Sequence, residues 1–287
     1  MEGEEEDSND PTALNNQSFW KKLIIFAAGA FMNFLTGLII IVALYAGAKA
    51  FYVPVITDFA DGCPLQSESG LQVGDRLVSI DGERVYVYSD VSLLLGRNKT
   101  GVFDLKVKRD GQTVTLKDFP MERAEYTDQQ GQTYTGFGLM FGTEEATVGS
   151  RLRYSWNNAV DFVRIVRLSL QMLVTGQAGM DDLSGPVGIV STITQVGTAS
   201  ETIAAAVENI LYFGAMLAVN LAVMNMLPIP ALDGGKIFFL IIDEIAMKLF
   251  RKKIPEKYEM AVNTVGFVAL MGFMLVVTFN DVFKLFG

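Results

Sequence analysis

Long apolar stretches and one polar region divide the chain. Residues 23–48 contain no charged side chain, residues 203–232 contain only Glu208, and residues 261–279 contain none. Each stretch can cross a hydrocarbon core of about 30 Å as a helix. The pattern predicts a mixed membrane protein: an α-helical transmembrane bundle with three spans, placed within residues 21–50, 201–250 and 260–282.

The polar region, residues 51–145, has the two-residue period of β-strands. Apolar and polar positions alternate before the pair Asp81-Gly82 and again on both sides of Asp110-Gly111. An Asp-Gly pair between alternating runs is a strong hairpin signal. Residues 88–95, between the two pairs, suit a short helix. The region is therefore predicted to be a soluble α+β domain inserted between the first two spans.

Two further segments complete the predicted organisation. Residues 1–20 form an acidic N-terminal segment, and residues 151–200 form an amphipathic linker region. Within this linker region, residues 154–174 are predicted to be an amphipathic helix. Its apolar positions, interrupted by Arg164 and Arg167, are expected to lie against the bilayer surface.

The distribution of charge predicts how the chain is oriented in the membrane, but it does not indicate a binding partner. Of the 287 residues, 50% are hydrophobic and 19% charged, and many of the acids behind the formal charge of −9 lie in the first ten residues. Nothing in this balance indicates nucleic-acid binding. The short basic segments are expected on the cytoplasmic side, which places the inserted domain and the C-terminus outside. These segments contain Lys21, Lys22, Lys248, Arg251, Lys252, Lys253 and Lys257.

Candidate chemistry is concentrated at residues 225–235, Asn-Met-Leu-Pro-Ile-Pro-Ala-Leu-Asp-Gly-Gly. A regular helix cannot continue through these prolines and glycines. Irregular backbone at membrane depth survives only where protein or a water-filled cavity satisfies it. Asp233 is then a functional candidate. The alternative is that Asp233 caps a following helix over residues 236–250.

This segment resembles the second signature of the site-2 protease family, the intramembrane zinc metalloproteases of peptidase family M50. Two other segments agree in order, residues 28–34 and 183–189, and residues 69–85 resemble a bacterial PDZ domain. A small β-sandwich without a ligand is the alternative for this domain. PDZ domains bind extended peptides along a strand edge. The strand expected to do so here consists of Val55, Ile56, Thr57, Asp58 and Phe59.

The resemblance implies a role for each residue of the motif. Asp233 would be the third zinc ligand, and Asn225 would lie near the scissile peptide and hold its carbonyl. The motif also includes Pro228, Pro230, Gly234 and Gly235. Implied substrates are single-span membrane proteins or remnant signal peptides, with peptide tails at the PDZ domain and the lipid bilayer as surroundings.

The sequence departs from the family in one decisive respect, because it contains no histidine. Family members carry His-Glu-x-x-His, which places two zinc-binding imidazoles on one helical face. Without them the chain is expected to be inactive alone. A truncated gene model is the favoured explanation, with a genuine short product and a pseudoprotease left open. If the short chain is complete, it could be a non-catalytic PDZ adaptor that captures extracytoplasmic tails.

Three residues are expected to have no direct catalytic part. Gly29 and Asn33, four apart on one helical face, are predicted to let the first span pack closely against a neighbour. Asp281 is placed outside the membrane, on the far side from the site, and its replacement by alanine is expected to be silent.

Overall fold

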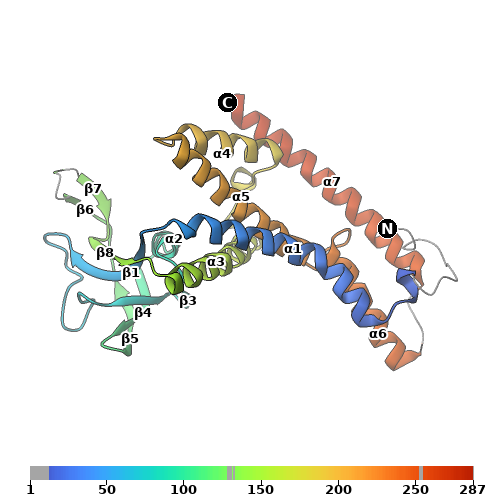
Figure 1. Cartoon of the computed structure of the whole chain (residues 1–287), viewed down its shortest axis with the longest axis horizontal. Coiled ribbons are helices and arrows are strands. Elements are labelled where there is room, and N and C mark those ends of the chain that lie inside the picture. Colours follow the sequence, from blue (N-terminus) through green and yellow to red (C-terminus); the bar gives the residue numbers. More distant parts are fainter. Residues whose placement is uncertain (1–12, 128–130, 132, 252–254, 287) are drawn as a thin grey trace. The chain divides into compact units, whose positions relative to one another are not determined.

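A computed structural model describes residues 13–127, 131, 133–251 and 255–286. It divides into two compact units (Figure 1). One unit comprises the chain up to Leu44 and from Phe162 onward, and the other is Tyr45–Asp161. We refer to them as the membrane unit and the PDZ-like unit. Three helices of the described chain are long and apolar enough to span a bilayer, which confirms the predicted mixed architecture.

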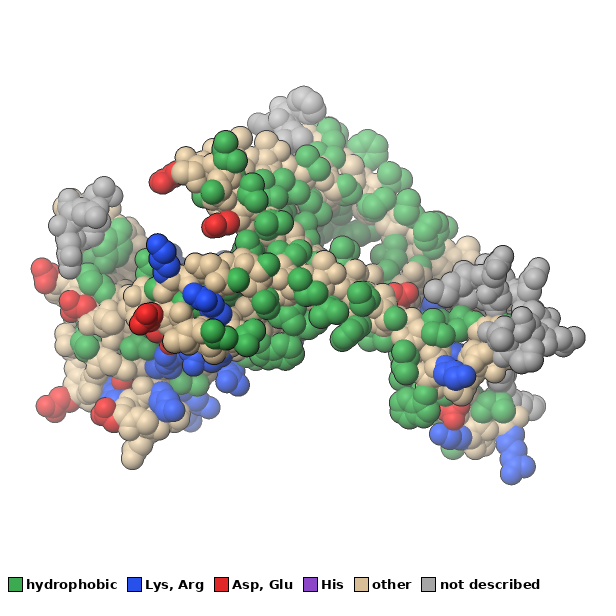
Figure 2. All heavy atoms as spheres, in the orientation of Figure 1, with side chains coloured by type: hydrophobic (Ala, Val, Ile, Leu, Met, Phe, Trp, Pro, Cys, Tyr) green, Lys and Arg blue, Asp and Glu red, His purple; other side chains and the backbone are tan. Residues whose placement is uncertain are grey.

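The membrane unit is helical. It contains α1 (Phe19–Ala46) as far as Leu44 and α3 (Val148–Val174) from Phe162 onward. Its other elements are η1 (Leu14–Asn16), η2 (Met180–Asp182), α4 (Pro186–Thr198), α5 (Ile203–Asn225), α6 (Asp233–Phe250) and α7 (Glu256–Phe286). The candidate spans lie in α1, α5 and α7. Many large apolar side chains of these helices are exposed, and they cover much of the visible helical surface (Figure 2). That exposure is expected of helices whose solvent is lipid.

Small residues bring α1 and α5 together. A Cβ atom at Gly37 would lie 2.7 Å from Cγ2 of Val219 and 2.8 Å from the backbone oxygen of Ala215. The facing positions Ala215 and Val219 are fully buried. Close backbone approach at small residues is the usual basis of helix packing in membranes. The same face of α1 carries Gly29, two turns earlier.

The turn before α4 is attached to the C-terminal part of α7 by Asp281. This carboxylate is buried and accepts hydrogen bonds from the backbone N–H groups of Gly185, at 2.8 Å, and Gly188, at 2.7 Å. A Cβ atom at either glycine would lie within about 3 Å of the Asp281 carboxylate. The expectation that replacement of Asp281 leaves zinc binding and activity unchanged stays a prediction, but these contacts predict that the replacement lowers stability. The N-terminus of α4 is thus capped by a carboxylate from a helix distant in the sequence. The residues around the start of α4 give no sign of this cap.

The PDZ-like unit is built on an antiparallel sheet with the strand order β5-β4-β2-β1-β8, and β3 pairs with β2. Its strands are β1 (Ala50–Phe59), β2 (Arg76–Ile80), β3 (Glu83–Arg84), β4 (Val102–Arg109), β5 (Gln112–Pro120) and β8 (Leu139–Glu145), and β6 (Ala124–Thr127) and β7 (Thr133–Gly136) form a separate pair. The helices are α2 (Ser89–Arg97) and the first part of α3 (Val148–Val174). The predicted hairpin at Asp110-Gly111 and the short helix are both present.

Strand β4 contributes every second side chain to the core of this sheet. Phe103, Leu105 and Val107 are buried, and the residues between them are exposed. At the edge of the core, Arg109 donates two hydrogen bonds of 2.7 Å to the Asp75 carboxylate, which is completely buried. These bonds raise the pKa of Arg109 above its usual value. The ion pair ties the glycine-rich turn before β2 to the end of β4.

Candidate functional site

The backbone of the motif segment leaves the helical path at Asn225, where α5 ends. Short turns follow, with hydrogen bonds from Leu227 N to Met224 O at 3.1 Å and from Leu232 N to Ile229 O at 3.2 Å. Neither Pro228 nor Pro230 has an N–H group to leave unpaired. The segment therefore forms a compact loop, residues 226–232, which we name the site loop.

Gly234 and Gly235 let the site loop fold back over the first turn of α6. A Cβ atom at Gly234 would lie 2.2 Å from the backbone oxygen of Leu227, and one at Gly235 would lie 2.4 Å from that of Ile229. Both glycines are buried. No side chain fits at either position, because the obstructing atoms are backbone rather than flexible side chain. The glycine pair is thus required by the close approach of the loop.

Helix α7 holds the site loop from another side. The side-chain oxygen of Asn263 accepts the Ala231 N–H at 3.2 Å, and Ala231 has a left-handed φ of 73°. A Cβ atom at Gly266, one turn along α7, would lie 2.4 Å from Cβ of Pro230. Neither Asn263 nor Gly266 was found by the sequence reasoning. The one available signal was a polar residue followed three positions later by a glycine inside an apolar span.

Asp233 is the first residue of α6 and is partly buried. The N-cap is Leu232, and no side chain makes a capping hydrogen bond. The alternative that Asp233 caps the following helix is therefore not supported, and α6 begins at Asp233 rather than at residue 236. Within the described part of the chain, the Asp233 carboxylate makes no hydrogen bond or ion pair. The positive end of the helix dipole favours its charge.

Helix α1 lies beside this carboxylate. A Cβ atom at Gly29 would be 3.4 Å from Oδ2 of Asp233, and Nζ of Lys236 lies 5.7 Å from the centroid of the Phe26 ring. The neighbour that Gly29 accommodates is therefore the first turn of α6. Asn225, at the end of α5, is half-buried and likewise makes no hydrogen bond within the described chain. The site thus contains one carboxylate and one amide with free hydrogen-bonding capacity.

This donor set can supply one metal ligand. A carboxylate oxygen is a common zinc ligand, and a catalytic zinc site takes about three protein ligands. Among the residues that the structure describes, no group of three or more His, Cys, Asp or Glu side chains is placed to hold a metal ion. The Asp233 carboxylate can therefore serve as at most one ligand of such a site.

The strand expected to bind peptides has no free edge. Residues 55–59 belong to β1, where Val55 pairs with Arg76 of β2 on one side and Ile56 with Phe141 of β8 on the other. In the described chain the edge strands of the sheet are β5, which pairs only with β4, and β8, which pairs only with β1; β8 is the one next to β1. Tyr88, just before α2, lies 5.4 Å from the Phe141 ring, so α2 begins beside β8. The sequence pattern identified a strand but not its neighbours.

Comparison with known proteins identifies the class. The model of peptidase family M50 matches residues 1–273. The chain is 34% identical, over 98% of its length and 79% of the relative's, to CPE1693 of Clostridium perfringens, a protein named as a candidate zinc metalloprotease. It is 35% identical to the regulator of sigma-W protease RasP of Bacillus subtilis, over 93% of this chain and 60% of that protein. The zinc metalloprotease RasP of Shouchella clausii is 30% identical over the same shares.

The chain therefore belongs to peptidase family M50, the site-2-type membrane zinc metalloproteases. It spans about four-fifths of the clostridial relative and three-fifths of the two RasP proteins.

Proposed function

We propose that the chain provides the aspartate half-site of an intramembrane zinc endopeptidase that cleaves single-span membrane proteins or remnant signal peptides. The observation that carries this proposal is the Asp233 carboxylate, partly buried in a membrane unit and without a partner in the described chain. An ionisable side chain at such a position is costly and is usually functional. The glycines and prolines around it shape a loop that presents it beside α1.

In this proposal Asp233 is the third zinc ligand and Asn225 holds the carbonyl of the scissile peptide. Bound zinc would supply an activated water and polarise the substrate carbonyl. Asn225 has an amide without a hydrogen bond in the described chain, as a donor to a developing oxyanion requires. Pro228, Pro230, Gly234 and Gly235 fix the loop between these two residues.

The sequence as given is proposed to be inactive by itself. It contains no histidine, so both imidazole ligands and the water-activating glutamate have to be supplied by residues outside it. We expect the purified chain neither to hold stoichiometric zinc nor to cleave a membrane substrate. Metal analysis and a chelator-controlled cleavage assay test this, and chelator-sensitive cleavage by this chain alone would falsify it.

Joining the chain to a helix that carries His-Glu-x-x-His is the decisive experiment. The joined protein is expected to gain zinc and chelator-sensitive activity. Asp233→Ala should then lower zinc occupancy and activity together, because metal affinity depends on ligand number and charge. Asn225→Ala should keep zinc and slow turnover by about 100-fold. Full zinc occupancy and activity in Asp233→Ala would show that the ligand assignment is wrong.

The PDZ-like unit is proposed to capture extracytoplasmic peptide tails along β8 rather than along residues 55–59. Its free edge can pair with an extended peptide, which is the usual mode of such domains. We further propose that the motif end of the membrane unit lies towards the cytoplasm. A reporter inserted within residues 101–112 should be extracytoplasmic and one fused after Arg251 cytoplasmic. The reverse labelling would contradict this orientation.

The free edge of β8 also favours a second candidate function, a membrane adaptor that binds tails without cleaving them. The joined protein separates the two. If it held zinc and still did not cleave a membrane substrate, while peptide tails bound to the PDZ-like unit, the adaptor would be the better account.

A further inference from the structure

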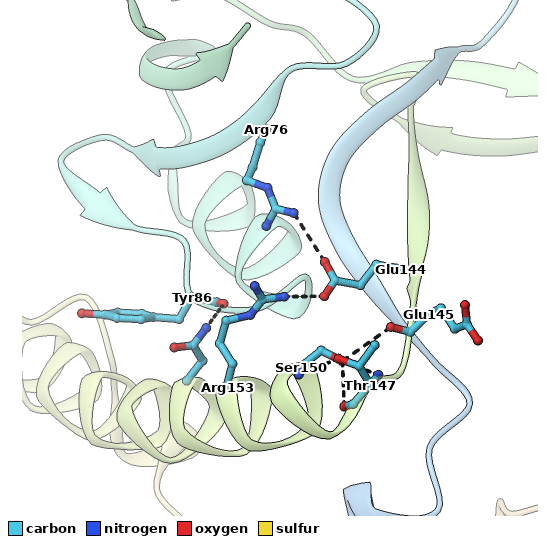
Figure 3. Close-up of polar contacts among 8 residues, drawn as sticks. Arg76, Tyr86, Glu144, Glu145, Thr147, Ser150 and Arg153 are labelled. Atoms are coloured by element: carbon cyan, nitrogen blue, oxygen red, sulfur yellow. Dashed lines mark hydrogen bonds and ion pairs between the residues drawn. The ribbon is translucent and has the colours of Figure 1, made fainter. Parts of the chain in front are cut away.

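The first turns of α3 are a fixed part of the PDZ-like unit (Figure 3). Glu144 of β8 forms ion pairs with Arg153 of α3 and, at 3.6 Å, with Arg76 of β2. Asn157 of α3 donates to the backbone oxygen of Tyr86 at 3.3 Å. These contacts come from different strands and loops, so they fix both the position and the rotation of the helix within the unit.

The same turns also contact the end of the first span. Within the PDZ-like unit, Arg151 donates to the backbone oxygen of Ala48 at 2.9 Å, and the Asn158 amide donates to the Tyr45 hydroxyl at 2.9 Å. Tyr45 is in the last turn of α1, which ends at Ala46. The first part of α3 therefore lies close to the C-terminal end of a candidate membrane-spanning helix.

Three large apolar side chains protrude from these turns. Val148, Leu152 and Trp156 are 72%, 57% and 54% exposed. Because they are spaced four residues apart, they lie along one face of the helix. The polar residues that attach α3 to the unit lie on its other faces. We name these three residues the exposed stripe.

The stripe is not the apolar face that the sequence predicted to lie on the bilayer. That face was expected over residues 154–174, but Tyr154, Phe162 and Val166 in this segment are buried against protein. Phe162, for example, packs edge-on against Tyr212 of α5, with ring centroids 5.4 Å apart. Of the three exposed residues, Val148 and Leu152 precede the predicted segment, and Trp156 lies within it.

We propose that the exposed stripe is a membrane-contact surface that rests in the boundary between lipid headgroups and acyl chains. The helix that carries it is attached to Tyr45 and Ala48, at the C-terminal end of the first candidate span and just after it. Tryptophan is enriched at this depth because its ring is apolar and its N–H polar. Lys49, just after the end of α1, is exposed and suits anionic headgroups. This surface is independent of the proposed catalytic role.

Trp156 itself is the probe for a direct test. The chain has two tryptophans, so Trp20→Phe leaves Trp156 as the single emitter in the full chain. The variant is reconstituted in phosphatidylcholine–phosphatidylglycerol vesicles that carry bromine at a shallow or a deep acyl position. The proposal expects Trp156 about 5–10 Å into the headgroup–acyl boundary. Shallow bromines should then quench it more strongly than deep bromines, and aqueous iodide should quench it weakly.

A matched control uses the same unit. Tyr134→Trp, combined with Trp20→Phe and Trp156→Phe, places the single tryptophan on β7, where Tyr134 is 37% exposed. It should be quenched by iodide and not by brominated lipid. A second variant, Val148→Ser with Leu152→Ser in the Trp20→Phe chain, should shift Trp156 emission to the red and reduce its quenching by lipid. Both substitutions are at exposed positions, so the far-ultraviolet circular dichroism should not change.

Two results would overturn the proposal. Trp156 that responds to the quenchers in the same way as the β7 control would show that the stripe faces water. Trp156 protected from both quenchers, with emission that depends on the protein-to-lipid ratio, would show that a second copy covers the stripe instead of lipid.

Discussion

Two aspartates, one in each unit, have opposite surroundings. Asp75 of the PDZ-like unit is fully buried, receives two hydrogen bonds from Arg109 and accepts a third from the backbone N–H of Gln72. Asp233 of the membrane unit is partly buried and has no such partner within the described chain. A buried carboxylate that accepts several hydrogen bonds stabilises a fold. One whose lone pairs are free can bind something else.

The difference is not simply one between a soluble and a membrane environment. Asp281 belongs to the membrane unit, is as well buried as Asp75 and accepts two backbone hydrogen bonds. The presence of hydrogen-bond donors at the carboxylate therefore separates Asp75 and Asp281 from Asp233 more clearly than the kind of surroundings does. We therefore predict that replacement by alanine lowers stability most at Asp75, less at Asp281 and least at Asp233.

The largest effect is expected for Asp75→Ala. The change leaves the guanidinium of Arg109 without its main partner in a partly buried position, at a cost of about 3 kcal/mol. Hydrogen exchange on the full chain should show loss of protection in β2 and β4 with little change in α5. Asp61→Ala, at an exposed aspartate of the same unit, is the control and should change nothing. Equal behaviour of the two variants would contradict the comparison.

An intermediate effect is expected for Asp281→Ala. It removes the acceptor of two backbone N–H groups at the start of α4 and should cost about 1–2 kcal/mol. Hydrogen exchange should rise at residues 185–190. Asp281→Asn keeps one acceptor oxygen and should recover part of the protection. If Asp281→Ala left exchange at these residues unchanged, the cap that the structure shows would have no energetic weight.

The smallest effect on stability is expected for Asp233→Ala in the chain as given. Only a favourable helix-dipole interaction is lost, worth about 0.5 kcal/mol. The melting temperature in detergent should barely move. A loss as large as that for Asp75→Ala would mean that Asp233 has a structural partner, and its availability as a ligand would be in question.

Much of the fold follows from local patterns in the sequence. The three spans and the Asp110-Gly111 hairpin depend on runs of neighbouring residues, and all are present in the structure. The interruption predicted at the prolines and glycines of residues 225–235 is present as well, since α5 ends at Asn225. The first proline of the motif lies three residues beyond this end.

What could not be predicted depends on contacts between distant segments. Asp281 accepts a hydrogen bond from the Gly185 N–H, 96 residues away in the sequence. Asn263 accepts one from the Ala231 N–H, 32 residues away. The free edge of β8 depends on strand order, because alternation shows that a strand exists but not which strands flank it. The motif itself indicated Asp233 and Asn225, but not the supports that hold their loop.

The close approach of backbone to Gly234, Gly235 and Gly266 has a genetic consequence. At Asp75 and Arg109 the interacting atoms belong to two side chains, so a defect at one position can in principle be suppressed by a change at the other. At the three glycines the obstructing groups include main-chain atoms of residues 226–230, which every amino acid possesses. A search for second-site suppressors should therefore recover compensating changes for the ion pair and none for these glycines.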